Sequence, residues 1–118
     1  MNNVSLVGRL TQAPELKLIG EEKYVTKFNL AVDRYLGSTQ KDEKRSEGKP
    51  TADFPRITVW GKTAENCCKY LDKGALISIT GKVATSKFEK EDGEVVYMTE
   101  IVADRVQFLE SANSENKL

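Results

Sequence analysis

Apolar and polar residues alternate along most of the chain, which is the pattern of β-strands that bury one face. The alternation predicts strands over about 4–14, 23–34, 53–60, 75–88 and 95–109. In the fourth of these, Ile77, Ile79 and Val83 mark the side that faces the core. An Asp92-Gly93 pair between the last two segments predicts a hairpin turn.

The period changes after the third alternating segment. Apolar residues then recur at i, i+3, i+4 and i+7, which predicts one short helix. These positions are Ala64, Cys67, Cys68 and Leu71. We expect Thr63 to cap the start of this helix and Gly74 to end it.

The predicted order is three strands, one helix and two strands, with no pattern of parallel crossovers. It indicates an all-β fold: a five-stranded barrel of the OB type with one short helix between strands 3 and 4. We expect one OB-fold domain over residues 1–110 and a short polar C-terminal tail over 111–118. Residues 37–51 carry seven charged side chains and almost nothing apolar, so we expect them to form a mobile loop.

Composition narrows the possible functions. The chain has 118 residues, no histidine, and two neighbouring cysteines, Cys67 and Cys68, so we expect reduced thiols, no metal site, no cofactor and no enzyme. No apolar run is long enough to cross a membrane and no signal peptide is evident, which predicts a cytoplasmic protein. Lys and Arg total 18, as do Asp and Glu; this balance argues mildly against a nucleic-acid partner unless the charges are unevenly distributed.

The segment 53–60 has an unexpected aromatic face. Strand periodicity turns Ile57 and Val59 to the core. The opposite, exposed side is then predicted to carry Phe54, Arg56, Thr58 and Trp60. Two large rings flanking a cation on a surface that should be polar favour a binding role.

Two further aromatic residues extend this face. Phe88 is in phase with polar rather than apolar neighbours, so we expect it to be exposed, and Tyr35 follows the second predicted strand. Rings beside cations suit unpaired nucleobases, because bases stack on the rings while Lys and Arg contact phosphates. The alternative is that these rings pack against another element or an oligomeric partner.

Motifs throughout residues 1 to about 110 make the chain resemble the bacterial single-stranded DNA-binding proteins. The residues that carry the resemblance are Leu6-Val-Gly-Arg-Leu10 followed by Pro14-Glu15, Phe28-Asn-Leu-Ala-Val32, Asp53-Phe-x-x-Ile-x-Val-Trp-Gly-Lys62, Ala64-Glu65, Tyr70-Leu-x-Lys-Gly74, Gly81-Lys-Val-x-Thr85, Thr99-Glu-Ile-Val-Ala103 and Val106-Gln-Phe-Leu109. Their order and spacing, more than any one motif, make the match specific.

The resemblance implies an OB barrel that forms a homotetramer and binds single-stranded DNA of any sequence during replication, recombination and repair. The family's base-stacking positions correspond here to Tyr35, Phe54, Trp60 and Phe88. Its phosphate contacts correspond to Arg56, Lys62, Lys73 and Lys87, with Arg9 and Arg34 as secondary candidates. The resemblance also implies a place at the bacterial nucleoid, or in the host cytoplasm for a phage or plasmid gene.

The chain departs from the family pattern in two places. It stops at Lys117-Leu118 without the family's long tail and acidic, Phe-ended tip, so recruitment of repair and replication proteins is not an expectation for this sequence. A charged insertion, with Lys41, Lys44 and Arg45 among its bases, separates the second and third predicted strands. The alternative function is an OB-fold module, similar to the primosomal replication proteins, that chiefly binds protein partners.

Overall fold

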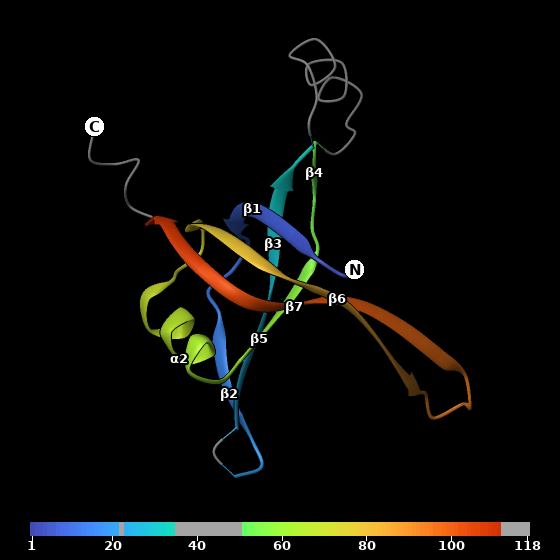
Figure 1. Cartoon of the computed structure of the whole chain (residues 1–118). Coiled ribbons are helices and arrows are strands. Elements are labelled where there is room, and N and C mark those ends of the chain that lie inside the picture. The colour runs from blue at the N-terminus through green and yellow to red at the C-terminus, as the bar shows by residue number, and fades with distance from the viewer. Residues whose placement is uncertain (22, 35–50, 112–118) are drawn as a thin grey trace.

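The computed structural model describes residues 1–21, 23–34 and 51–111. These ranges form one seven-stranded sheet and one helix (Figure 1). The strands are β1 (Val4–Leu10), β2 (Glu15–Ile19), β3 (Lys23–Asp33), β4 (Ala52–Asp53), β5 (Arg56–Trp60), β6 (Leu76–Glu89) and β7 (Val95–Glu110). The helix, α2, spans Gly61–Tyr70 between β5 and β6.

Five of these strands close into a ring. Its order is β1, β6, β7, β5 and β3, and β1 completes it by pairing with β3 as well as with β6. The pairs are antiparallel except β5 with β7, which is parallel. Gly8 permits the closure, because a Cβ there would overlap the carbonyl oxygen of Ala31. The five-stranded OB barrel predicted from the sequence is confirmed, with the helix between its third and fourth strands.

Apolar residues that alternate along the strands fill the barrel. Leu30, Ile57 and Ile77 have no exposed surface. Helix α2 adds Cys67 and Leu71 to the same cluster, so its apolar side packs onto the barrel core. Burying each large aliphatic side chain contributes about 1.5–3 kcal/mol, which makes this cluster the main stabilising element.

Two strands were not predicted. β2 is exposed at all five positions and, among the described strands, pairs with β3 alone. β4 has two residues and is separated from β5 by Phe54 and Pro55, so the strand predicted over 53–60 is interrupted. Proline has no N–H to continue a ladder, but the Pro55 carbonyl oxygen accepts a hydrogen bond from the N–H of Leu30 at 3.1 Å.

The ends of the helix differ from the prediction. Helix α2 starts at Gly61, whose φ of 72° turns the chain directly from β5 into the helix, and no side chain caps this end. The expectation that Thr63 caps the helix is therefore wrong. Gly74 lies beyond the C-cap at Leu71, and its N–H donates to the Leu10 carbonyl oxygen at 2.8 Å. Gly74 thus ties the loop after the helix to β1 instead of ending the helix.

Beyond the barrel, β6 and β7 continue as a two-stranded hairpin over residues 83–99, which we call the arm. Figure 1 shows it projecting away from the barrel at the right. Val83, which was predicted to face the core, is exposed because the sheet here has left the core behind. The predicted turn at Asp92 and Gly93 is confirmed: Gly93 has φ 88° and donates its N–H to the Lys90 carbonyl oxygen at 2.9 Å.

Three predicted features lie wholly or mostly outside the described residues. They are Tyr35, the loop over 37–51 apart from Thr51, and the tail after residue 111. Within the described part of the chain, no helix has both the length and the apolar character needed to span a membrane.

Candidate nucleic-acid interface

One side of the sheet lies outside the barrel and continues from β3 across β5 and β7 onto the arm. We call it the outer face. Strand register defines it, since Thr58 of β5 lies beside Val102 of β7 and every second residue shares a face. The antiparallel ladder between β6 and β7 then brings Phe88 to the same side. Arg56, Trp60 and Phe88 therefore share the outer face, as the alternation predicted.

Three aromatic rings are exposed at positions chosen from the sequence. The exposed fractions are 59% for Phe54, 46% for Trp60 and 48% for Phe88. Trp60 is the cross-strand partner of Val25, which is buried although it lies outside the main core cluster. Because the Cβ atoms of such partners lie about 5 Å apart, the indole and Val25 are neighbours on the same face of the sheet. The exposed part of each ring is available to a ligand.

Thr58 does not fit the prediction of an exposed side chain. It lies on the outer face by register, but its side chain is buried and its hydroxyl donates to Glu100 Oε2 at 2.7 Å. Lys27 of β3 reaches the same oxygen, with its Nζ at 3.9 Å. Side chains from the two neighbouring strands thus cover Thr58, and a single-strand alternation pattern cannot reveal such a cover.

Arg56 lies in a basic hollow that sequence reasoning missed. The hollow measures about 200 Å³ and is lined by Lys17 of β2, Lys27 of β3 and Arg56 of β5, with Glu15 as a carboxylate at its side. Three cations on three adjacent strands give this part of the sheet a local positive charge despite the zero net charge of the chain. The missed signal was the alternation at residues 15–18, which places Glu15 and Lys17 on one side of an additional strand.

The three lysines predicted to contact phosphates are all exposed but lie in different places. Lys62 is in the first turn of α2, directly after the end of β5, and Lys73 follows the other end of the helix. Lys87 is the sequence neighbour of Phe88 but lies on the opposite face of the arm, where its cross-strand partner is Tyr97. Adjacency in sequence therefore does not bring Lys87 to the outer face.

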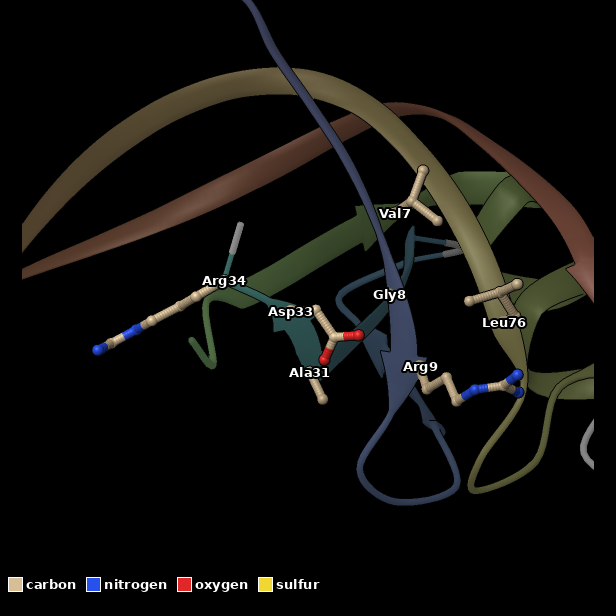
Figure 2. Close-up of a pocket in the computed structure, with 7 residues that line it drawn as sticks. All are labelled: Val7, Gly8, Arg9, Ala31, Asp33, Arg34 and Leu76. Carbon is tan, nitrogen blue, oxygen red and sulfur yellow. The ribbon is translucent and has the colours of Figure 1, made fainter. Parts of the chain in front are cut away.

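The secondary candidates Arg9 and Arg34 both contact carboxylates. Arg9 donates to the Gly74 carbonyl oxygen at 2.9 Å and pairs with Glu110 at 3.3 Å. Arg34 donates from Nε and Nη2 to Asp53 Oδ1 at 3.1 and 3.0 Å. Figure 2 shows that their side chains point away from each other around a hollow beside β1. These contacts tie strand ends together, so both arginines have structural roles, and a role in binding stays a prediction.

The thiol of Cys67 is held protonated in the core. Burial, and secondly the neighbouring Cys68, raise its pKa to about 12. Both cysteines are free. Over the described ranges, no group of three or more Cys, Asp or Glu side chains is arranged to hold a metal ion. Cys67 therefore serves as an apolar core residue.

Comparison with known proteins gives the family. The model of the family described as "Single-strand binding protein family" matches residues 1–109, which include the barrel, the helix and the arm. The chain belongs to the single-strand binding protein family. The resemblance inferred from the sequence motifs is thereby confirmed, and this family is one of binding proteins rather than enzymes.

Relatives in this family match nearly the whole chain. A "Single-stranded DNA-binding protein" of Clostridium tetani is 46% identical over 117 residues, which cover 98% of this chain and 75% of the relative. "Single-stranded DNA-binding protein 1" of Lactococcus lactis is 43% identical, covering 99% and 73% of the two chains. A "Single-stranded DNA-binding protein" of Staphylococcus aureus is also 43% identical, covering 98% and 70%. The similarity thus extends over the entire outer face.

Proposed function

We propose that this protein binds single-stranded DNA without reading its sequence. The observation that carries the proposal is the exposure of Trp60 and Phe88 on one continuous sheet face. Phe54, in the break between β4 and β5, is also exposed, and Arg56 lies between Phe54 and Trp60 in the sequence. Each unpaired base offers a flat π-face, so stacking tolerates any base and contributes about 1–3 kcal/mol per base. A duplex keeps its bases paired and gives such rings nothing to stack on.

The proposed binding uses two kinds of contact, with bases and with phosphates. Phe54, Trp60 and Phe88 stack bases, and Tyr35, outside the described residues, is the fourth stacking position. The proposed phosphate contacts are Arg56, Lys62 and Lys73, Lys17 and Lys27 of the basic hollow, and Lys87 on the opposite face of the arm. The family match over residues 1–109 supports this assignment.

The biological role follows from family membership. We propose that residues 1–110 form the binding domain, that the protein acts as a homotetramer in the cytoplasm, and that it covers unpaired strands during replication, recombination and repair without catalysing a reaction. The names of the relatives, all single-stranded DNA-binding proteins, support the nature of the ligand. Light scattering tests the tetramer.

Trp60 is the single tryptophan in the chain, so its fluorescence reports directly on the outer face. Titration with poly(dT) is expected to quench this fluorescence at near-stoichiometric amounts, because a stacked base contacts the indole. Fluorescence that stays unchanged up to a large excess of poly(dT) would contradict the proposal and favour a protein-interaction module.

Substitutions at the same position separate stacking from packing. Trp60→Ala is expected to weaken binding, while Trp60→Phe retains a ring over Val25 and should bind more tightly than the alanine variant. Circular dichroism of both variants checks that the barrel is intact. Equal affinity of Trp60→Ala and the wild type would count against the assignment of this ring.

A further inference from the structure

Helix α2 and β7 enclose a groove that the proposed function does not use. It measures about 610 Å³, within the usual range for ligand sites. Its lining includes Thr63, Asn66 and Tyr70 from one side of the helix, and Arg105, Gln107 and Phe108 from the strand. We call it the helix groove.

The strand side of the helix groove is an open sheet edge. β5 pairs with β7 only at residues 101–103, and along the described chain no strand pairs with the same edge at 104–108. Register shifts against β6 leave Asp104 and Leu109 without partners at the two ends of this segment. Bulges of this kind re-aim the side chains between them and often lie beside functional sites.

Two aromatic rings line the groove. The ring centroids of Tyr70 and Phe108 lie 6.4 Å apart with an interplanar angle of 54°, which is an ordinary geometry for a packed aromatic pair. The residues nevertheless remain 61% and 43% exposed. The two rings thus hold each other in place and leave ring surface open.

The polar lining suits bases rather than phosphates. The amide of Asn66 carries both donors and an acceptor, which match the edges of nucleobases. Asp104 and Arg105 contribute opposite charges, so the lining itself has no net charge. Two of the cations proposed to contact phosphates flank the helix residues of this lining in the sequence: Lys62 comes just before Thr63, and Lys73 lies three residues beyond Tyr70.

The groove begins where the pairing of β5 with β7 ends, at Val59 and Ala103. Trp60, the last residue of β5, is the N-cap of α2, so the helix side of the groove begins three residues after a proposed stacking ring. A nucleic-acid strand that passes Trp60 and Lys62 therefore meets the groove next and reaches Lys73 at its far end. Such a path would also bring the strand to Lys73, the proposed phosphate contact that lies outside the sheet.

We infer that single-stranded DNA leaves the outer face past Trp60 and continues along the helix groove to Lys73, with a base stacked on the rings of Tyr70 and Phe108. This inference rests on the proposed binding of single-stranded DNA and adds a second segment to its path. The other candidate occupant, a second copy of the chain paired with the open edge of β7, is an outcome of the test.

A relocated tryptophan tests the path directly. In the double variant Trp60→Phe with Tyr70→Trp, the only tryptophan of the chain lies in the groove. Oligo(dT) of about 16 nucleotides, the upper site size for one OB fold, is expected to quench this reporter. Oligo(dT) of about 4 nucleotides, the lower site size, should quench Trp60 in the wild type and leave the groove reporter nearly unchanged.

The possible results separate this inference from the proposed function. If the longer oligonucleotide quenches wild-type Trp60 but not the groove reporter, the inference fails and the proposed function stands. If wild-type Trp60 itself is not quenched, the proposed function fails. A reporter signal that changes with protein concentration in the absence of DNA would instead place a second copy of the chain in the groove and overturn the inference.

Affinity measurements provide a matched control. Tyr70→Ala is expected to lower affinity for the longer oligonucleotide by at least about fivefold, which corresponds to the loss of one stacked base, and to leave affinity for the shorter one within about twofold. Tyr70→Phe retains the ring and should bind both like the wild type. Equal losses in Tyr70→Ala for both lengths would show a general effect on the domain and contradict a separate second segment.

Discussion

The barrel and the arm share strands β6 and β7 but use them differently. Within the barrel, Ile77 and Ile79 of β6 are buried, whereas Val83 of β6 and Val95 of β7 are exposed on the arm. Apolar residues occur along the strands of both regions, but only the barrel has a core for them to enter. The difference indicates that the barrel provides most of the stability and that the apolar side chains of the arm are free to serve the proposed binding surface.

The largest expected effect comes from a barrel residue on β5. Ile57 has no exposed surface, so Ile57→Ala should lower the free energy of unfolding by about 2–5 kcal/mol, through lost burial and the cavity left behind. The matched arm variant Val95→Ala should change it by no more than about 0.5 kcal/mol. Urea denaturation measures both, and a similar loss in the two variants would mean that the arm is part of the stabilising core.

Removing an aromatic ring from the arm should have the opposite effect: weaker binding with little change in stability. Phe88→Ala is expected to weaken binding of oligo(dT) by roughly 5- to 150-fold, the equivalent of about 1–3 kcal/mol for one lost stacked base. The melting temperature should remain close to that of the wild type, since Phe88 is half exposed. Binding is measured by fluorescence titration of Trp60. A variant that melts early yet binds normally would contradict the division between the two regions.

Removing a positive charge next to the barrel should have a smaller effect on affinity. It should also change how affinity depends on salt concentration. Lys62→Ala is expected to reduce the slope of log K against log salt by about 0.7, because one phosphate contact and its released counterion are lost. The control is Lys90→Ala at the arm tip, where the ammonium group already pairs with Glu94 at 3.7 Å. An unchanged slope in Lys62→Ala would remove this lysine from the interface.

A pH dependence that originates in the barrel is expected to be negligible near neutral pH and to appear only in alkaline solution. The pKa of Cys67 rises from 9.0 to about 12 on burial, so the folded protein holds this proton more tightly than the unfolded chain. Its stabilising contribution is complete below pH 9 and decreases as the pH rises from about 9 towards 12. Cys67→Ala should therefore lose less stability over this window than the wild type, as measured by urea denaturation at each pH. A parallel decline in both proteins would contradict this prediction.

Most of the barrel was predictable because its strands bury one face and expose the other. The same alternation, applied to the sequence alone, correctly placed Phe54, Trp60 and Phe88 at the surface. The prediction failed at positions where the residue pattern does not match the environment in the folded protein. β2 buries neither face, Val83 has the right phase but no core beside it, and α2 begins at Gly61 through a backbone turn instead of a side-chain cap.

The parts of the site that were missed depend on contacts between strands. Lys17 and Lys27 join Arg56 only when β2, β3 and β5 lie in register. Thr58 is buried by side chains from strands that flank it. A single sequence contains the phase of each strand but not which strand lies beside it, so such clusters become visible only in the folded sheet.

The parallel pairing of β5 with β7 delays completion of the ring during synthesis. β7 is the last of the described strands and lies between β5 and β6, so a nascent chain that ends at β6 leaves an edge of each of these strands without a neighbour. Strand partners this far apart in sequence also slow folding, because a long loop must close first. The unfinished barrel is therefore the form most exposed to mispairing with other chains, and this exposure ends when β7 pairs with both β5 and β6.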